Sequence, residues 1–585
     1  MRKLLLALST VAIFGCSDNS SPTESATHTS EATEMDGVGG VNVITSTIIS
    51  DPANDPYSVE NMSKAMRKQV LAKSGADSQE VEQLTLEPNY LYVRFLANGK
   101  KGVSELKAYD TSLVLFKHPL DYKPIRKPAV YIDPLLPDSI IPMFATVPAN
   151  YKFGPTRYEI IKKLFLVEPL DDECDDNECS DGADSTTAVR ALAKKASDQS
   201  SSLMEKLNDV GVSLRDIEWE SLSMTGNLGN RVDAQKLEPG ESPVMGWSLF
   251  GGGKKLGGHL TYEDDSFKDS NGKFIPQPLE GVRVTGGYSY YWREAHTDKN
   301  GYFKIPEKWT FKIDFEANFD SDEFLLEDGH SSYGEDLEIE HNNYKSDWNE
   351  TFSGNKAKWC VVWTAAYQYW YGDRFGLRKP RTNTAGNMSL DIEVYYKNDK
   401  DLKTAVEDAD VTYSNDAYGY YFIGYDFSYD DRILIRAYNR SSEGLYRSTI
   451  HEIAHFSLYS NQKFNIFKEE KENYRDAYTR GIEWYFTNRR YCPKDKNAVC
   501  GIKYQIGYVG LIQDLIDDNG SYAKGSGSDK VSGFKITDVE KAFLASKTLD
   551  EVKSYILKNL PSGKGGRSYT EKNLKALFDH WKGWL

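Results

Sequence analysis

The chain has 585 residues, too many for a single hydrophobic core, so three or four domains are expected. Its formal charge of −16 at pH 7 argues against a nucleic-acid partner and against electrostatic adhesion to an anionic membrane surface. The 38 Tyr and 11 Trp residues supply enough aromatic surface for broad cores or for carbohydrate-like ligands. Composition alone does not separate those two uses.

The amino terminus has the layout of an export signal. A basic start at residues 1–3 precedes an apolar stretch over residues 4–14, which is too short to span a bilayer as a stable helix. Residues 13–16, Ile-Phe-Gly-Cys, resemble a bacterial lipobox, in which cleavage precedes a cysteine that is then acylated. The resemblance implies a signal peptide over residues 1–15 and lipid attachment at Cys16. An ordinary secretory signal with an incidental cysteine is the alternative.

Residues 16–55 are expected to form a flexible tether. Ser, Thr, Glu and Gly dominate its first half, and apolar residues are few there. Ser17 follows the cysteine, in place of the Asp that retains lipoproteins at the inner membrane in some bacteria. We therefore expect a lipid-anchored protein of the bacterial cell envelope, held in the outer membrane, with its body periplasmic or surface-exposed.

Residues 56–250 are expected to fold as an N-terminal α+β region. Alternating apolar residues predict strands and wider apolar spacing predicts helices. The predicted strands cover residues 90–95, 112–116 and 129–132, and the predicted helices cover residues 158–165 and 187–207. This region contains no motif that indicates a chemical function.

Residues 251–340 change to short strands and turns. Asp298, Asn300 and Gly301 form an Asp-x-Asn-Gly turn, which supplies left-handed residues between two strands, and an aromatic residue follows it. The pattern resembles the carboxypeptidase-regulatory-like β-sandwich, a common module of secreted and outer-membrane proteins. The resemblance implies an Ig-like Greek-key sandwich that positions other domains, and it implies no carboxypeptidase activity.

Residues 341–585 are expected to form a third, α+β unit. A helix rich in Trp and Tyr is predicted over residues 356–372. Strands are predicted over 391–396, 419–425 and 432–438, and helices over 445–460, 467–490, 508–517 and 538–546. The predicted fold class of the whole chain is multidomain α+β.

The strongest functional signal is an HExxH motif that begins at His451. Positions i and i+4 are neighbours on one helix face, so His451 and His455 can converge on a single ion, with Glu452 beside the metal-bound water. A strand over residues 432–438 and a Ser-Ser N-cap precede the motif helix. This order resembles zincin metallopeptidases, and the resemblance implies Zn²⁺ held by both histidines with Glu452 as general base. A surface helix with two incidental histidines is the alternative.

A zinc site of this type needs a third protein ligand. In metzincins it would be a His six residues after His455, where this chain has Asn461. In gluzincins it is a Glu on the next helix, about twenty residues on, and the helix predicted over 467–490 offers Asp476 there. Asp is also an acceptable oxygen ligand, as in aspzincins. We therefore expect Asp476 as third ligand, with Glu483 as the alternative ligand or as a hydrogen-bond partner of a ligand histidine.

The cysteines suit an oxidising compartment. Cys492 and Cys500 bracket a short polar loop beyond the predicted ligand helix, and Cys174 and Cys179 bracket four residues of an acidic loop. Both pairs are predicted to form disulfides, because neither has CxxC spacing nor a neighbouring histidine. Cys360 is left over and is expected to be a buried thiol.

These observations predict a lipid-anchored zinc metallopeptidase of the cell envelope that hydrolyses peptide bonds. The expected partners are a protein or peptide substrate and a membrane reached through the lipid anchor, with no nucleic acid. A second hypothesis is a non-catalytic adhesion or glycan-binding lipoprotein with a degenerate zincin domain. The unusual third ligand, the accessory sandwich and the aromatic content all permit that alternative.

Overall fold

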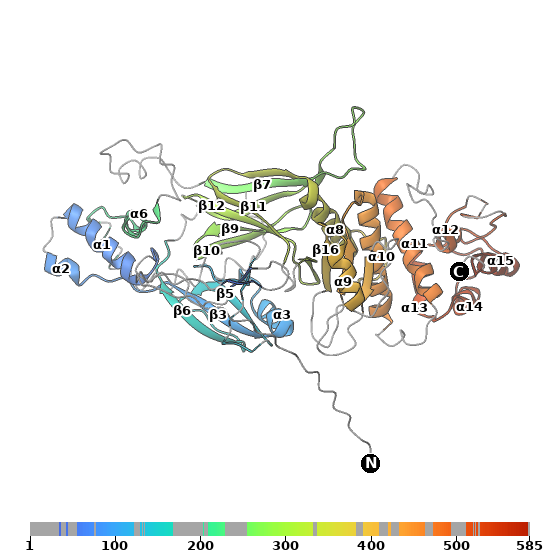
Figure 1. The fold of residues 1–585 in the computed structure, drawn as a ribbon, viewed down its shortest axis with the longest axis horizontal. Helices are drawn as coiled ribbons and strands as arrows, with labels where there is room; N and C mark the ends of the chain where they lie inside the picture. The colour runs from blue at the N-terminus through green and yellow to red at the C-terminus, as the bar shows by residue number, and fades with distance from the viewer. Residues whose placement is uncertain are drawn as a thin grey trace, which may run out of the picture.

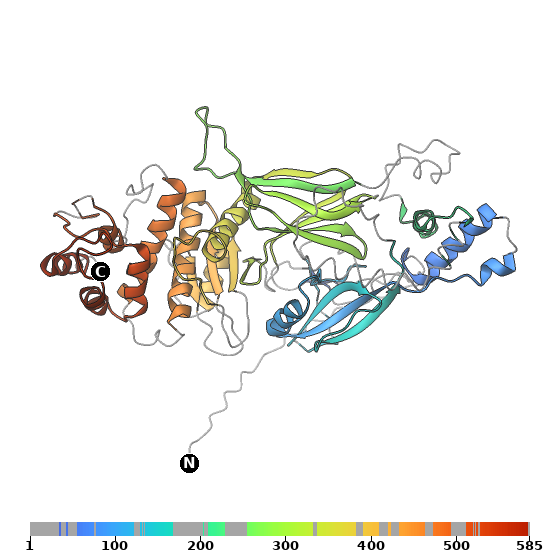
Figure 2. The same ribbon diagram turned by 180° about the vertical axis from the view of Figure 1, so that it is seen from behind.

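The chain runs along the long axis of the molecule, from an N-terminal unit past a central pair of β-sheets to a helical C-terminal end (Figure 1). Figure 2 shows the same order from behind. The computed structural model describes residues 34–36, 42–44, 55–74, 78–121, 129–131, 133, 135–137, 139–167, 203, 207, 209–228, 254–309, 311–330, 336–381, 390–408, 419–422, 432–462, 472–492, 510–518, 520, 522–523 and 527–582. The fold is mixed α+β with several antiparallel sheets, as the sequence predicts.

Three antiparallel strands form the main sheet of the N-terminal unit, in the order β5-β3-β6. Strand β3 is buried along most of its length because it is the central strand, and helix α3 follows it directly and packs on it. Helices α1 and α6 pack against each other. The bounds are α1 Val59–Ser74, α2 Ser78–Glu82, β3 Tyr90–Asn98, α3 Gly99–Tyr109, β5 Ile140–Pro148, β6 Arg157–Leu164 and α6 Leu214–Met224, with a smaller sheet of β1 Glu34–Asp36, β2 Asn42–Ile44 and β4 Ala129–Tyr131.

Residues 158–165 were predicted to be a helix, and this prediction is wrong. They lie in strand β6, which pairs antiparallel with β3. Tyr158 and Ile160 are exposed on this strand at the edge of the described sheet. The closely spaced apolar residues look helical in the sequence, but ladder pairing with β3 decides the conformation.

Other parts of the N-terminal prediction also differ from the structure. Residues 112–116 form no strand, and Phe116 makes only an isolated bridge with Phe144. The helix predicted over 187–207 falls almost entirely outside the described residues. Strands β1 and β2 pair within the stretch predicted as a tether, residues 16–55, where Val and Ile favour strand structure.

Two sheets face one another at the centre of the molecule, β10-β9-β12-β14 and β11-β7-β15 with β8 beside β7 (Figure 1). Aromatic residues join the sheets: the Phe315 ring of one sheet lies 5.9 Å from Phe303 and 5.9 Å from Trp348 of the other. The predicted turn is present, because Gly301 has φ +83° and Asp298 accepts backbone hydrogen bonds across it. The bounds are β7 Lys254–Tyr262, β8 Gln277–Pro278, β9 Arg283–Tyr288, β10 Tyr291–His296, β11 Tyr302–Trp309, β12 Ile313–Asn318, β14 Glu338–Tyr344 and β15 Trp348–Phe352.

The predicted boundary between residues 340 and 341 does not separate the two neighbouring sheets. Strand β13, Phe324–Asp328, leaves the sandwich and pairs in parallel with β16 of the C-terminal sheet. The chain then returns to the sandwich as β14 and β15 before helix α8 begins. All five β13 residues are buried: the strand pairs with β16 along one edge, and helix α8 packs on it. The two units are therefore interleaved.

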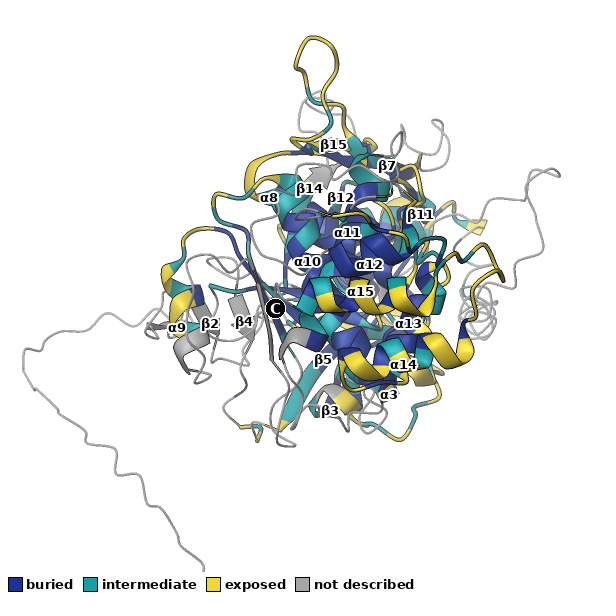
Figure 3. Ribbon diagram, turned by 90° about the vertical axis from the view of Figure 1, so that its right-hand side faces the viewer, coloured by how far each residue is buried: buried dark blue, intermediate teal, exposed yellow. Residues whose placement is uncertain are grey.

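The C-terminal unit has a four-stranded sheet in the order β13-β16-β18-β17, with helices packed on it. Strands β13, β16 and β18 are parallel, and β17 is antiparallel at one edge. Helices α10 and α11 are largely buried, as Figure 3 shows from the C-terminal end. The bounds are α8 Gly354–Trp370, β16 Leu390–Tyr395, α9 Lys400–Asp408, β17 Gly419–Phe422, β18 Arg432–Arg436, α10 Ser442–Asn461, α11 Glu472–Tyr491, α12 Gly510–Ile516, α13 Ile536–Leu544, α14 Leu549–Asn559 and α15 Glu571–Lys582.

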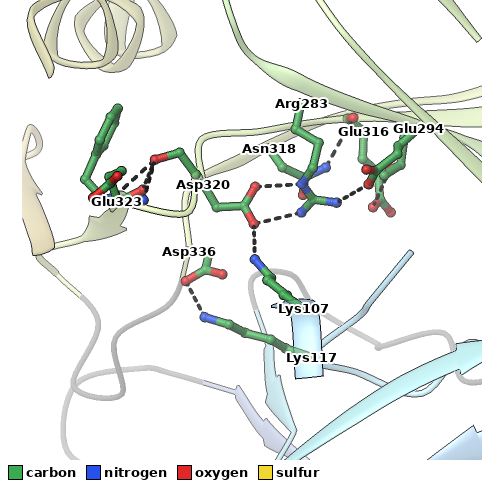
Figure 4. A network of polar contacts seen from close by, with 12 residues as sticks. Lys107, Lys117, Arg283, Glu294, Glu316, Asn318, Asp320, Glu323 and Asp336 are labelled. Carbon is green, nitrogen blue, oxygen red and sulfur yellow. Dashed lines mark hydrogen bonds and ion pairs between the residues drawn. The ribbon is translucent and has the colours of Figure 1, made fainter. Parts of the chain in front are cut away.

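Ion pairs join the N-terminal unit to the sandwich (Figure 4). Asp320 receives two hydrogen bonds from Arg283, with its carboxylate oxygens 2.8 and 3.0 Å from the guanidinium nitrogens. Lys107 of α3 lies 3.7 Å from the same carboxylate, and Lys117 lies 2.6 Å from Asp336. The two hydrogen bonds from Arg283 fix the Asp320 carboxylate, and Lys107 of the N-terminal unit contacts that carboxylate.

Candidate metal centre

Helix α10 carries the HExxH motif through the interior of the C-terminal unit. Its first turn is capped by Ser441, whose hydroxyl oxygen accepts a hydrogen bond from Gly444 N. The helix packs against α8, α11 and the strands β17 and β18. It is buried over most of its circumference, which suits its largely uncharged residues. The motif therefore lies in the core and not on an exposed helix.

The imidazoles of His451 and His455 converge, with their Nε2 atoms 3.2 Å apart. Their ring planes are nearly perpendicular, at 79°, with centroids 4.8 Å apart. Two nitrogen ligands of a tetrahedral zinc ion, with bonds of about 2.0–2.1 Å, lie about 3.3 Å from each other. The histidine pair thus has the spacing that one shared ion requires. Ligand atoms of His451, Glu452 and His455 all lie within 4.8 Å of one another.

Glu483 of helix α11 fixes the orientation of His451. Its Oε2 lies 2.9 Å from Nδ1 of His451. Arg447 and Arg480 each approach the same carboxylate within 2.9 Å. Burial opposes ionisation of Glu483, but Arg480, His451 and Arg447 outweigh it and lower its pKa to about 2. An ionised carboxylate only accepts hydrogen bonds, so Nδ1 of His451 donates to Glu483, and Nε2 is the ring nitrogen that faces a metal.

The other two motif residues are also electrostatically suited to a metal site. Burial, reinforced by the charges of His451, Arg475 and Arg480, holds the pKa of His455 well below its ordinary value, so this imidazole is neutral. Glu452 is buried, and that burial raises its pKa to about 7 even though His451 and Arg480 oppose the shift. A neutral imidazole can ligate a metal, and a carboxyl with a pKa near neutrality suits proton transfer.

Asp476 and Glu483 occupy different sides of the histidine pair. Asp476 Oδ1 lies 3.9 Å from His455 Nε2, and the side chain is partly exposed. This separation is about half an ångström longer than that expected between two ligands of one zinc ion. Glu483 instead contacts the Nδ1 edge of His451, the ring edge away from the converging nitrogens. Asp476 therefore lies on the Nε2 side of the histidine pair, and Glu483 lies on the Nδ1 side of His451.

Most of the predicted cysteine chemistry lies outside the described residues. Cys16, Cys174, Cys179 and Cys500 are all among residues that the structure does not describe. Cys492, at the end of α11, is disulfide-bonded. Cys360 is a free, buried thiol of helix α8, as the sequence predicts.

Two arginines hold Glu483 in place, and sequence reasoning missed Arg447. Arg480 lies one turn before Glu483 on α11, so it shares a face with the carboxylate it contacts, whereas Arg447 lies one turn before His451 on α10 and reaches Glu483 from the other helix. Helical spacing was a usable signal for Arg480 alone. The pairing between helices α10 and α11 has no such signal, because it depends on how the two helices pack.

A second group of buried carboxylates lies toward the C-terminus. Asp514, Asp517 and Asp529 bring oxygens within 4.8 Å of one another. Asp514 accepts hydrogen bonds from Trp581 Nε1 and Ala523 N, both at 2.8 Å. Burial raises the pKa of Asp514 to about 8 and that of Asp529 to about 6. We refer to these three residues as the Asp514 cluster.

No family model, curated protein or solved structure matches this chain. Among the described residues, no helix is both long and apolar enough to cross a membrane. The argument for function therefore depends on the geometry and chemistry of the residues around His451 and His455.

Proposed function

We propose that the protein is a zinc-dependent metallopeptidase. The observation that carries this proposal is the 3.2 Å separation of the two Nε2 atoms of His451 and His455. The hydrogen bond to Glu483 orients the His451 ring, and the low pKa of His455 keeps that imidazole neutral. A pair of imidazoles with this spacing, one buried and one largely buried, is a donor set that zinc prefers. The donor residues therefore fit the ion that the HExxH motif suggests.

Asp476 is proposed as the third protein ligand. Its Oδ1 lies 3.9 Å from His455 Nε2, and the side chain is partly exposed, so it can adjust its position. Two imidazoles and one carboxylate leave a fourth position for water, which is the arrangement of catalytic rather than structural zinc. The hydrogen bond from His451 Nδ1 to Glu483 supplies the carboxylate support that such ligand histidines commonly have.

Glu452 is proposed as the general base. When bound, zinc would lower the pKa of its water and polarise a substrate carbonyl. Glu452 lies between the two histidines in sequence and beside them in space, where its carboxylate can accept a proton from that water and return it to the leaving amine. Its enclosed position excludes bulk water from this proton transfer.

The sheet beside α10 suggests why the substrate would be a peptide. Strand β17 is the antiparallel edge of the described four-stranded sheet and packs against α10. An edge strand offers backbone N–H and C=O groups that an extended peptide can pair with. Such pairing would lay a peptide bond alongside the helix that carries His451 and His455. The substrate class proposed is therefore an extended peptide or protein segment.

We also propose that lipid on Cys16 anchors the protein in the outer membrane of a bacterial cell envelope. The support is the Ile-Phe-Gly-Cys motif at residues 13–16 and the short apolar stretch before it. A Cys16→Ser protein should appear in the soluble fraction of the cell. If that variant still sediments with membranes in high salt, the anchor is not a lipid on this cysteine.

Cleavage of a broad peptide library by purified protein tests the proposed activity. Glu452→Gln should retain zinc while cleavage falls by about 10²–10⁴-fold, because only the base is removed. Glu443→Gln is a matched control, since Glu443 lies on the same helix in its first turn. A Glu452→Gln protein that cleaves as well as wild type would refute the assigned role. A zinc-loaded wild type that cleaves no peptide but binds glycans would support the adhesion alternative.

A further inference from the structure

The turn that follows β7 of the sandwich contacts both helices of the candidate metal centre. The turn covers residues 263–267, directly after Tyr262 at the end of β7, and in it Phe267 N donates to Asp264 O and Ser266 N donates to Asp264 Oδ1. Asp264 is 0% exposed, although carboxylates in turns are ordinarily solvated. Its burial follows from the helices of the C-terminal unit that pack on it. We call residues 262–267 the sandwich clasp.

Asp265 of the sandwich clasp holds the beginning of helix α10. Ser442 N donates to Asp265 Oδ1 at 3.0 Å, and Asp265 N donates to Ser442 Oγ at 3.2 Å. These are reciprocal contacts of the kind that satisfy the free N–H groups at a helix start, but the carboxylate comes from another unit of the chain. The negative charge also lies at the positive end of the helix dipole. The helix that carries His451 is thus capped from the sandwich.

Asp264 of the same clasp holds the end of helix α11. Tyr491 OH donates to Asp264 Oδ2 at 3.0 Å, and the Arg490 guanidinium lies 3.6 Å from the same oxygen. Arg490 also donates to the Tyr262 hydroxyl at 2.8 Å. The Arg490 guanidinium lies over the ring of Tyr446, 5.2 Å from its centroid, which ties the end of α11 to the start of α10.

Contacts along the two helices show that they run antiparallel from the clasp. Ser442 and Arg490 both contact the sandwich clasp, His451 contacts Glu483, and Gln462 donates to Tyr474 OH at 3.0 Å at the far end. The metal centre lies along α10 about 13 Å from Ser442, and Glu483 lies along α11 about 10 Å from Arg490, at 1.5 Å per residue. The clasp fixes one end of both helices close to the site.

We propose that Asp264 and Asp265 are positioning residues that set the axial register of α10 against α11, and with it the geometry of the metal centre. This inference rests on the proposed zinc site. The ligand histidines lie on one helix and the third carboxylate lies on the other, so a slip of either helix separates ligands that must share one ion. Ligand positions must hold within about 0.5 Å for such a site. The sandwich is therefore part of the support of the metal centre, although it contributes no ligand.

Substitutions of Asp265 in the full-length protein test this role. Asp265→Ala removes the carboxylate that Ser442 N contacts, and Asp265→Asn keeps an Oδ1 acceptor in its place. Asp269→Ala is a matched control from the tip of the same loop, because Asp269 accepts hydrogen bonds from Asn271 N and Lys273 N within its own turn. Three properties are measured: amide hydrogen exchange in the metal-free protein, zinc affinity by chelator competition, and the visible spectrum of the Co²⁺-substituted protein.

Asp265→Ala should speed amide exchange over residues 442–446, weaken zinc binding by about 5-fold, and change the Co²⁺ spectrum, because it removes a contact at the helix start. Asp265→Asn should restore most of the zinc affinity, and Asp269→Ala should match wild type. If Asp265→Ala speeds exchange but leaves zinc affinity and the Co²⁺ spectrum unchanged, the sandwich clasp only stabilises the helix start. This inference is then overturned, while the proposed metal centre still stands. A wild-type protein that binds neither Zn²⁺ nor Co²⁺ would overturn the metal centre and this inference together.

Discussion

Two buried carboxyl groups of the C-terminal unit, Glu483 and Asp514, reach opposite states of ionisation. Glu483 faces Arg447 and Arg480, and its pKa is lowered to about 2. Asp514 accepts hydrogen bonds from the neutral donors Trp581 Nε1 and Ala523 N, and its pKa is raised to about 8. Burial raises the pKa in both places, so the arginines decide the outcome.

The difference teaches what a supporting carboxylate at a metal site requires. Glu483 can hold the proton of His451 Nδ1 because it stays ionised, and it stays ionised because two guanidinium groups lie beside it. A carboxyl in the state of Asp514 holds a proton of its own near neutral pH and is a poorer acceptor. Ion pairs with arginine therefore keep the carboxylate beside the histidine pair ionised, whereas Asp514 receives hydrogen bonds from the neutral groups named above and keeps its proton.

The largest effect on stability is expected from Glu483→Ala. This change leaves Arg447 and Arg480 without the buried carboxylate that neutralises them, and it should reduce the free energy of unfolding by roughly 3 kcal/mol. Denaturant unfolding followed by tryptophan fluorescence measures the loss. A loss below about 1 kcal/mol would mean that solvent, and not Glu483, stabilises these arginines, and the contrast with the Asp514 cluster would fail.

Zinc affinity separates the roles of the two α11 acids. Asp476→Ala should weaken zinc binding more than Glu483→Gln does, because the first removes a proposed ligand and the second alters only its support. The Glu483→Gln loss should be about 10–100-fold. Affinities come from competition with a chelator of known strength, after unfolding curves confirm that both variants are folded. The reverse order of losses would move the ligand assignment from Asp476 to Glu483.

A smaller, pH-dependent effect is expected at the Asp514 cluster. The folded protein keeps protons on Asp514 and Asp529 that the unfolded chain, with carboxyl pKa values near 3.8, has lost. Stability therefore falls as the pH rises from about 4 through 6 and on toward 8. Asp529→Asn keeps the Oδ1 acceptor for Val531 N but cannot ionise, so its stability relative to wild type should improve over that range by on the order of 1 kcal/mol.

Asp550 provides a control of opposite sign for this measurement. Lys582 and Lys553 hydrogen-bond its exposed carboxylate and lower its pKa to about 2. Asp550→Asn should therefore lose stability relative to wild type as the pH rises from about 2 through 4. Thermal unfolding from about pH 2 to pH 8 covers both ranges and tests the Asp529→Asn prediction against this control. If the difference between Asp529→Asn and wild type does not change with pH, the proton uptake assigned to the cluster is wrong.

Local sequence patterns were sufficient for the elements that carry the metal centre. The strand predicted over 432–438 is β18, and the helix predicted over 445–460 is α10, because alternating and helical spacing is clear in both. The proposed ligands on α10 could be named because HExxH places them one turn apart on one element. Asp476 and Glu483 could be named only as alternatives, because their placement depends on how α11 packs on α10.

What the sequence could not predict depends on pairing between distant segments. Strand β6 was predicted as a helix, and its conformation comes from its ladder with β3. Strand β13 was assigned to the sandwich, but it pairs with β16 in the next unit. The contacts of Asp265 with Ser442 cross 177 positions of the chain, and no local pattern encodes them. Tertiary context decides each of these features.

Metal content is the most direct test of the central claim, because it needs no knowledge of the substrate. Purified wild-type protein, dialysed after exposure to Zn²⁺, should hold one zinc ion per chain by elemental analysis, and His451→Ala and His455→Ala should each lose it. Circular dichroism should show that both variants remain folded. A folded wild type that holds no zinc, or histidine variants that hold as much as wild type, would contradict the proposed metal centre.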